Sequence, residues 1–286
     1  SIGKLHTPKI TSSVSMFEGC SSLVSLPVFV TSNIVTGTSM FLNCGKLVLD
    51  PGDYIFDALV TGDTMFSGCK SIKTVTQIKC PKMTSGEKMF YECSGITTVG
   101  NIELSLCTDF SNAFYHCTSL QSVTTMYTPK LVSAWRIFEG CSSLVTVPIF
   151  DTTNVTICDN LFAGCEKLNI DVGKFNLPNV TNIIQLCYNC KSLTTISDLN
   201  APNVSNKSTK IFYGCTSLKS IGNINLPKAT SVEGLFNGCS ALSSVGNLDL
   251  SATTTVTNIL NGCVNLTSVG NITAPKATTG GTNLFN

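Results

Sequence analysis

The sequence Phe138-Glu139-Gly140-Cys141-Ser142-Ser143-Leu144 is the clearest copy of a phrase that returns along the whole chain. Its cysteine recurs eleven times, always 24 or 25 residues after the previous copy. The eleven cysteines are Cys20, Cys44, Cys69, Cys93, Cys117, Cys141, Cys165, Cys190, Cys215, Cys239 and Cys263. A fixed period of this length is typical of a repeat array, in which each unit contacts only its neighbours. The sequence therefore predicts a solenoid.

Each repeat carries the apolar spacing of a short strand. Counted from the cysteine as position 0, apolar residues recur at +3, +6 and +9, as in Leu120, Val123 and Met126. Proline or serine often follows near +12, where the missing N–H of proline suits the end of a ladder. We expect one strand per repeat, stacked into a parallel sheet about 50 Å long for eleven strands. The return to the next repeat is too short for a long helix and should be 3₁₀ or irregular chain.

A turn is expected immediately before each cysteine. Position −1 is glycine in seven repeats and asparagine in two, and both residues tolerate a positive φ. They are Gly19, Gly68, Gly140, Gly164, Gly214, Gly238 and Gly262, with Asn43 and Asn189. His116 also fits, since histidine is enriched at positive φ. Glu92 does not fit this account.

The composition narrows the range of partners. Charged residues make up 12% of the chain and the formal net charge is +1, so most of the polar surface must be Ser, Thr and Asn. Nucleic acid is not an expected partner, because no basic stripe is present. No apolar run approaches the roughly 18 residues of a membrane-spanning helix. The N-terminus lacks the apolar core of a signal peptide, although a processed export signal would leave the same start.

The eleven repeat cysteines are expected to be free, and the odd total of fifteen cysteines agrees with this. Equivalent residues of stacked coils lie about 4.8 Å apart, whereas the Cβ atoms of a disulfide lie about 3.8 Å apart. The repeat cysteines should therefore be buried thiols that act as small apolar side chains. Cys187 and Cys190 form a C-x-x-C, but Cys187 stands in the phenylalanine position of its repeat and no second pair completes a zinc site.

No catalytic, cofactor-binding or metal-ligating residue is expected. His116 and Cys117 invite a nucleophile-and-base interpretation, but His116 fills the turn position and Cys117 should face inward. An enzyme is the least favoured class of function.

The pattern Phe-x-x-Cys-x-x-Leu-x-x-Val, closed by proline, resembles the BspA-like class of leucine-rich repeats found in surface proteins of bacteria and some protists. The resemblance covers essentially the whole chain. It implies a β-rich solenoid, a leucine-rich-repeat-like right-handed coil stack with a parallel β-sheet face and about eleven 24–25-residue repeats. These repeats are longer than the usual ones of that class. The extra residue often stands in a pair such as Gly222-Asn223, and with it the sequence does not fix the residue at which the strand ends.

A second periodicity indicates duplication of a five-repeat block. The sequence from Phe17 to Val24 is identical to that from Phe138 to Val145, an offset of 121 residues. Each copy is followed by an atypical repeat in which an aspartate, Asp50 or Asp171, occupies the apolar +6 position. The strand there is expected to shift register or bulge. Solvated carboxylates are favoured over a ligand site.

The chain is expected to be a single solenoid over residues 1–286. Residues 1–15 supply only the tail of a repeat, and Leu284-Phe285-Asn286 stops where the next Gly-Cys should follow. Solenoids usually carry polar terminal caps. We therefore expect a stretch of a longer chain, or ends that a partner covers.

The favoured function is a non-catalytic adhesion or protein-recognition module, at the cell surface or secreted, which binds a host or neighbouring-cell surface protein or glycan. Its expected binding face is a row of hydroxyl side chains, for which plain solvated surface is an equal alternative. The row consists of Ser25, Thr74, Ser122, Thr146, Thr195, Ser220, Ser244 and Ser268. The alternative function is a structural, virion-associated part of a larger assembly, such as a bacteriophage fibre or appendage, in contact with other subunits.

Overall fold

The computed structural model describes residues 5–278 of the chain. It divides into two compact units, unit 1 with residues 1–151 and unit 2 with residues 152–286, each described here by itself. The incomplete repeat expected at residues 284–286 lies outside the described residues, as do the first four residues of the incomplete repeat at the N-terminus. That residues 1–286 form a single solenoid stays a prediction.

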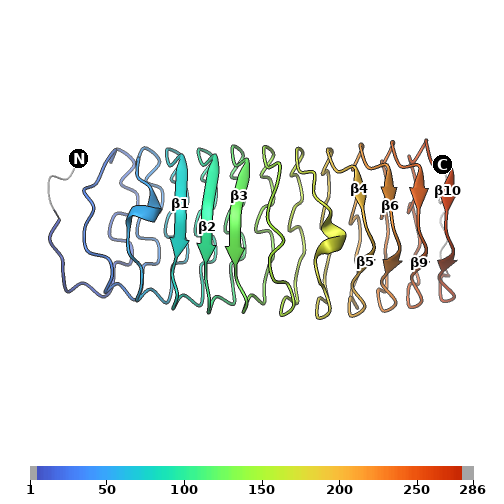
Figure 1. The fold of residues 1–286 in the computed structure, drawn as a ribbon, viewed down its shortest axis with the longest axis horizontal. Coiled ribbons are helices and arrows are strands. Elements are labelled where there is room, and N and C mark those ends of the chain that lie inside the picture. The colour runs from blue at the N-terminus through green and yellow to red at the C-terminus, as the bar shows by residue number, and fades with distance from the viewer. Residues whose placement is uncertain (1–4, 279–286) are drawn as a thin grey trace. The chain divides into compact units, whose positions relative to one another are not determined.

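Unit 1 is a stack of coils joined by parallel pairing. Its elements are the 3₁₀ helix η1 (Pro51–Asp53) and the strands β1 (Thr74–Lys79), β2 (Thr98–Glu103) and β3 (Ser122–Tyr127). The strands form one sheet in the order β1-β2-β3 (Figure 1). Equivalent residues of successive repeats are partners, as Val75 is with Val99 and Val99 with Val123.

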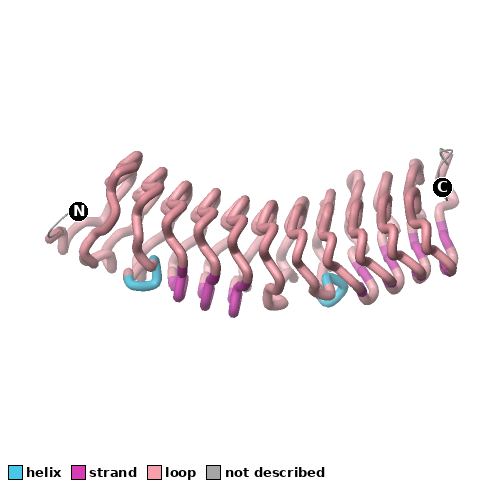
Figure 2. The backbone as a smooth tube through the Cα atoms, turned by 90° about the horizontal axis from the view of Figure 1, so that it is seen from above, coloured by secondary structure: helices cyan, strands magenta, loops and turns pink. Residues whose placement is uncertain are grey.

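Unit 2 has the same design with shorter strands. Its elements are η2 (Val172–Lys174), β4 (Thr195–Ile196), β5 (Leu199–Asn200), β6 (Ser220–Ile221), β7 (Ile224–Asn225), β8 (Ser244–Val245), β9 (Leu248–Asp249), β10 (Ser268–Val269) and β11 (Ile272–Thr273). They form two parallel sheets, in the orders β4-β6-β8-β10 and β5-β7-β9-β11. In each unit the strands lie along one side of the coils and loops form the rest (Figure 2).

Fewer repeats than the expected eleven contribute to the strand face. Within residues 5–278, strands occur in seven repeats, and an isolated bridge between Ser122 and Thr146 adds an eighth. The expected sheet of eleven strands was therefore wrong. In two repeats Pro27 or Pro148 stands in the middle of the expected strand, where proline cannot donate to a ladder.

Two other local sequences also interrupt the strands. In the repeats of Cys44 and Cys165, η1 and η2 replace the strand. In unit 2 each strand is split in two, by Ser197-Asp198 between β4 and β5 and by a Gly-Asn pair in the next three repeats, as Gly222-Asn223 does between β6 and β7. A Gly-Asn pair does not split a strand by itself, because Gly100-Asn101 lies inside the continuous strand β2. This split answers the question that the longer repeat left open about where the strand ends.

The predicted apolar positions form the core. Leu120, Val123 and Met126 are all buried. The phenylalanines before the cysteines stack along the array, with ring centroids 5.3 Å apart for Phe17 and Phe41 and for Phe66 and Phe90. This spacing is close to that of neighbouring strands, so in-register stacking satisfies both ring packing and backbone pairing.

The repeat cysteines are free, as predicted, and they do more than fill space. All but Cys20 are buried. Buried repeat thiols donate a hydrogen bond through Sγ to a carbonyl of the preceding coil, as Cys93 does to Phe66 at 2.9 Å and Cys117 to Phe90 at 3.2 Å. Where cysteine replaces phenylalanine, the carbonyl of Cys187 accepts from Cys215 in the same way at 3.1 Å. The thiol thus satisfies a buried acceptor that an aliphatic side chain would leave with one partner fewer.

Each coil contains two left-handed residues, at −1 and at −5. Glu92 and His116, both at −1, have φ of 54°, so the prediction for His116 is confirmed and Glu92 adopts the turn despite its side chain. Position −5, as in Lys88 with φ of 56°, was not foreseen, because most of its residues are neither Gly nor Asn. Inter-coil bonds hold both: the N–H of Lys88 donates to Ser111 O at 2.9 Å and that of Glu92 to Tyr115 O at 2.8 Å.

We expect Glu92→Gly to stabilise unit 1. A non-glycine residue in the left-handed region is disfavoured by roughly 1–2 kcal/mol, and the greater freedom of glycine in the unfolded chain offsets part of this gain. The net increase in the free energy of unfolding, measured in urea, should be up to about 1 kcal/mol. Glu92→Ala, the control, should give no increase. A glycine variant less stable than the natural chain would contradict the assignment.

The buried thiols should make folding sensitive to alkaline pH. Burial holds the pKa of the Cys93 and Cys117 thiols well above the ordinary value, while a thiol in the unfolded chain titrates near ~8.5. This contribution to stability is complete below that pH and is lost as the pH rises toward the folded pKa. Each such thiol should lower the free energy of unfolding by about 1.4 kcal/mol per pH unit above ~8.5.

Urea unfolding measured across the alkaline range tests this expectation. In the double variant Cys93→Ala, Cys117→Ala, the free energy of unfolding should fall less steeply with pH, because two fewer thiols lose a proton on unfolding. This difference in slope does not depend on the stability of the variant at neutral pH. Equal slopes for the two proteins would show that these thiols are not protected by the fold.

Candidate interaction surface

The structure brings most of the predicted hydroxyl side chains into two columns. In unit 1, Thr74 and Ser122 lie in β1 and β3, and Ser122 is bridged to Thr146. Thr98 of β2, which sequence analysis missed, stands between Thr74 and Ser122 as the partner of both. The sequence did carry a signal for Thr98, because it stands at +5 in its repeat, as Thr74 and Ser122 do. Ser25 is exposed but lies in a repeat without a strand, so it stands outside the column.

In unit 2 the four predicted residues form one unbroken column. Thr195 pairs with Ser220, Ser220 with Ser244, and Ser244 with Ser268. All four are at least partly exposed. We refer to the two columns and the exposed residues of the same strands as the strand face.

The strand face of unit 1 is polar and nearly neutral at its centre. In its strands, two adjacent residues at least partly exposed lie between two buried ones, as Thr76 and Gln77 do in β1. Thr125 Oγ1 donates to Asn101 Oδ1 at 2.9 Å across two strands. Lys79 and Glu103 form an exposed ion pair at 3.7 Å, which contributes little to stability because solvent screens it.

The strand face of unit 2 carries an amide ladder at the Gly-Asn pairs. The backbone N–H of Asn223 donates to Asp198 Oδ1 at 2.7 Å. The N–H of Asn247 donates to Asn223 Oδ1 at 2.9 Å, and that of Asn271 to Asn247 Oδ1 at 2.9 Å. The side-chain oxygens thus take the place of the strand carbonyls where the strand is split.

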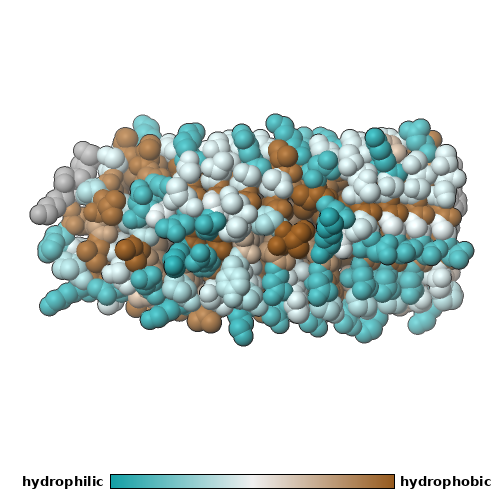
Figure 3. Space-filling model, in the orientation of Figure 1, coloured by the Kyte–Doolittle hydropathy of each residue, from teal (hydrophilic) through white to brown (hydrophobic). Residues whose placement is uncertain are grey.

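Exposed aliphatic side chains border the polar centre of unit 1, which sequence analysis did not foresee. Val24 and Val28 are 51% and 64% exposed in the first repeat, and Val145 and Ile149 are 49% and 50% exposed in the sixth. The two pairs are related by the duplication offset of 121 residues. Figure 3 shows this side of unit 1, where apolar side chains lie among hydrophilic ones.

A hollow opens beside the first of these aliphatic pairs. It has a volume of about 410 Å³ and is lined by Leu5, His6, Val28, Phe29, Val30, Thr31, Ser32, Asp53 and Ile55. Val28 and Ile55, 64% and 60% exposed, dominate its apolar part. The hollow is open and shallow rather than a closed ligand pocket, and it extends the apolar border of the strand face.

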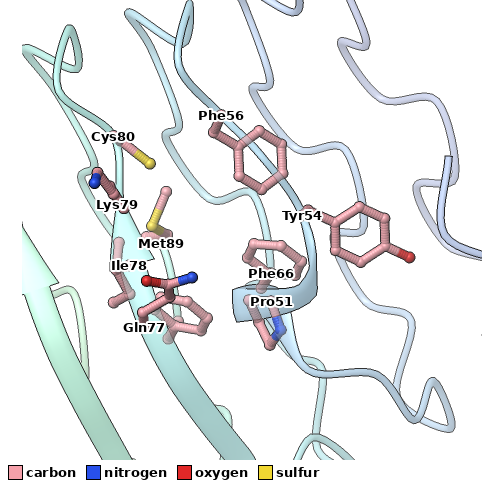
Figure 4. A pocket seen from close by; sticks show the side chains of 10 residues that line it. Pro51, Tyr54, Phe56, Phe66, Gln77, Ile78, Lys79, Cys80 and Met89 are labelled. Atoms are coloured by element: carbon pink, nitrogen blue, oxygen red, sulfur yellow. The ribbon is translucent and has the colours of Figure 1, made fainter. Parts of the chain in front are cut away.

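A much smaller cavity lies beside η1. The side chains of Tyr54, Phe56, Phe66 and Met89 surround it (Figure 4), and its volume is about 10 Å³. Such a space holds about one water molecule at most. Burial raises the pKa of Tyr54 to about 12. The cavity is a packing gap where the 3₁₀ turn replaces a strand.

Asp50 and Asp171 are structural caps. Asp50 Oδ1 accepts from the N–H of Gly52 at 2.8 Å, at the start of η1, and from the N–H of Thr76 in the next coil at 3.0 Å. Asp171 Oδ1 accepts from Gly173 at 3.1 Å and from Ser197 at 2.8 Å in the same arrangement. The expected register shift or bulge of a strand was wrong, because a capped 3₁₀ turn replaces the strand. The equivalence of the two sites agrees with the proposed duplication.

The candidate chemical residues do not converge. His116 is exposed, whereas Cys117 is buried with its thiol bonded to the preceding coil. Cys187 and Cys190 are both buried in the core, and burial raises the pKa of Cys187 well above its ordinary value. Among residues 5–278, no three His, Cys, Asp or Glu side chains gather as metal ligands would. No helix in the same range is long and apolar enough to cross a membrane.

The stacked phenylalanines, the buried cysteine column and the parallel strands define a leucine-rich-repeat solenoid of the BspA type, a class of protein-interaction scaffold that is typically not enzymatic. The family model for the BspA type leucine rich repeat region (6 copies) matches residues 169–286. The chain belongs to the family described as "Mycoplasma protein of unknown function, DUF285", whose model matches residues 1–104 and 108–221. No match was found among curated proteins.

One solved structure agrees with this fold, and two others are similar at a lower level. The chain is similar to a leucine-rich repeat protein from Bacteroides ovatus, with 24% identity and a TM-score of 0.55 over 91% of this chain. It spans 63% of the length of that protein. A leucine rich repeat protein from T. pallidum is 16% identical over 68% of this chain and 69% of its own, with a TM-score of 0.33. A leucine rich cell surface protein from Faecalibacterium prausnitzii is 18% identical over 78% and 87%, with a TM-score of 0.27.

The capping role of the aspartates predicts a matched pair of effects. Asp50→Ala and Asp171→Ala should each lower the free energy of unfolding by about 1 kcal/mol, because the cap bond to the 3₁₀ turn is lost. Asp50→Asn, which keeps an acceptor oxygen, should change little.

Urea unfolding measures all three variants, with Asp53→Ala as the control, since Asp53 is exposed in the same turn. If Asp50→Ala and Asp53→Ala proved equally mild, the capping role would be refuted.

Proposed function

We propose that this chain is a non-catalytic recognition module, displayed on a cell surface or secreted, which binds a protein partner through the strand face. The observation that carries the proposal is the in-register alignment of hydroxyl residues, all at least partly exposed, in β1 to β3 and in β4, β6, β8 and β10. Display at the surface is supported by the match to BspA-type repeats.

The physical properties of the strand face suit a protein surface. Short Ser and Thr side chains on paired strands lose little conformational freedom on binding, which lowers the entropic penalty of association. The aliphatic residues Val24, Val28, Val145 and Ile149 at the borders of the unit 1 face add apolar area to a polar centre. Interfaces between proteins combine such apolar contacts with many polar ones.

The test compares three kinds of probe. The purified chain is applied to an array of extracellular protein domains and to a glycan array, and its self-association is followed by sedimentation. The double variant Thr98→Lys, Ser122→Lys places two long charges on the strand face of unit 1. Thr118→Lys is the control, because Thr118 is exposed outside the strands and lysine occupies the equivalent position at Lys70 and Lys191.

We expect the natural chain and the control to bind a protein on the array, and the double variant to bind it at least about tenfold more weakly. Binding to glycans alone would overturn the proposal, and so would equal affinity of the natural chain and the double variant for the protein. Assembly into large oligomers without a foreign partner would instead favour the structural, virion-associated alternative.

A further inference from the structure

The rarest side chains of this protein meet in three successive turn segments of unit 1. The sequence contains one tryptophan, Trp135, and one arginine, Arg136, and they are adjacent. Two of the six tyrosines, Tyr91 and Tyr115, occupy the −2 position of neighbouring repeats, and His116 is one of two histidines. In a chain that is mostly Ser, Thr, Asn and aliphatic residues, Trp135 and Arg136 have no counterpart in the other repeats.

The aromatic rings and the guanidinium form two sets of contacts on successive turns, and the charge of Arg136 acts electrostatically on Tyr91. Tyr91 and Tyr115 stack with centroids 4.7 Å apart and planes 6° apart, and the ring of His116 lies 4.3 Å from that of Tyr115. Arg136 Cζ lies 4.8 Å from the centroid of the Trp135 ring, a cation–π contact. Trp135 is 38% exposed, so the cluster belongs to the surface rather than the core.

The polar groups of this cluster are incompletely paired. Arg136 Nε lies 3.2 Å from Glu139 Oε2, but neither atom makes a hydrogen bond of good geometry. The Arg136 side chain is 36% exposed, and its terminal guanidinium nitrogens are not among the buried unpaired groups. Asn112, which is only 4% exposed, also has an Nδ2 group without a partner. Native proteins seldom leave such groups unsatisfied.

Unit 2 shows what the repeat alone produces at these positions. Tyr188 and Tyr213 stack at 5.1 Å, and Lys210 Nζ lies 5.7 Å from the centroid of Tyr213. The tyrosine pair with a cation at −5 is therefore a feature of both units. The additions that distinguish unit 1 are Trp135, the planar guanidinium of Arg136 and the half-buried carboxylate of Glu139.

We propose that Tyr91, Tyr115, Trp135 and Arg136 form a second interaction site, which takes a polypeptide segment carrying a carboxylate next to an apolar side chain. The terminal nitrogens of Arg136 offer the parallel donors that bind a carboxylate in two hydrogen bonds. Trp135 and the edges of the tyrosines offer apolar contact. Trp, Tyr and Arg are the residues most enriched where binding energy concentrates at protein interfaces.

The geometry disfavours the other macromolecules. A sugar ring stacks on a free aromatic face, and one face each of Tyr91, Tyr115 and Trp135 is already covered. A polyanion needs a cationic surface, whereas this region mixes both signs of charge. Its charged residues are Glu87, Lys88, Glu92, Arg136 and Glu139. The site is distinct from the strand face and does not depend on the function proposed for it.

The test uses a phage-displayed library of random linear peptides, selected on the natural chain. Selected peptides are then titrated against the protein while tryptophan emission is recorded. Since Trp135 is the only tryptophan, its emission reports on this cluster alone. We expect peptides with Asp or Glu beside an apolar residue, and a change in emission that saturates on binding.

Two variants are matched to residues that the repeat already accepts. Arg136→Gln places at −5 the residue found at Gln185, and Trp135→Thr places at −6 the residue found at Thr38, Thr209 and Thr257. Each should fold as the natural chain does and weaken peptide binding at least about tenfold. Arg136→Lys should recover only part of the affinity, because lysine lacks the paired donors. Lys210→Gln in unit 2 is the control and should bind normally.

The outcomes separate clearly. Acidic peptides whose affinity falls in Arg136→Gln and Trp135→Thr but not in Lys210→Gln support the site. Peptides without a shared acidic residue, peptides that bind the variants normally, or failure to select any peptide would each overturn it. Binding of a glycan array that depends on Trp135 would overturn it in favour of a sugar. Fluorescence-labelled peptide provides the readout for Trp135→Thr, and circular dichroism checks that the variants are folded.

Discussion

The structure depends on the contact between each coil and the next at the phenylalanine and cysteine columns. The tight turn that carries these residues has two left-handed positions, and such a turn leaves backbone groups that its own coil cannot pair. The next coil pairs them: alternate N–H groups donate to its carbonyls, and its buried thiol donates back, as Cys93 does to Phe66 O. The phenylalanine rings stack at the same spacing. A single coil would satisfy none of these groups, which is why the architecture exists only as a stack.

This dependence divides the coil into a constrained part and a variable part. The turn segment keeps its geometry at every repeat, even where Glu92 or His116 must adopt a positive φ. The strand segment varies: it is a continuous strand in β1, a pair of short strands around Gly222-Asn223, or a capped 3₁₀ turn after Asp50. Variation is tolerated there because side-chain oxygens of Asp and Asn can replace missing strand carbonyls, as Asn223 does for Asn247.

Both proposed interaction surfaces are built from residues at exposed positions of this frame. The strand face uses the +5 column, and the cluster around Trp135 uses the −2, −5 and −6 positions of the turn segments. Neither surface needs a pocket, and neither requires the frame to change. An array of this kind can therefore acquire a binding site by substitution at single positions, since the Trp135 position holds Thr in three other repeats and the Arg136 position holds Lys or Gln elsewhere.

The sequence by itself determined the period, the solenoid, the identity of the core columns and the free state of the cysteines. These follow from spacing, because a residue that recurs at a fixed step occupies the same place in every coil. It also placed most of the hydroxyl row, including Thr74 and Ser122. Only the tertiary structure decided which repeats form strands, since Pro27 and Asp50 act through pairing with the next coil. It alone showed that Tyr91 stacks on Tyr115 and that Arg136 lies over Trp135, because side-chain contact depends on direction as well as on spacing.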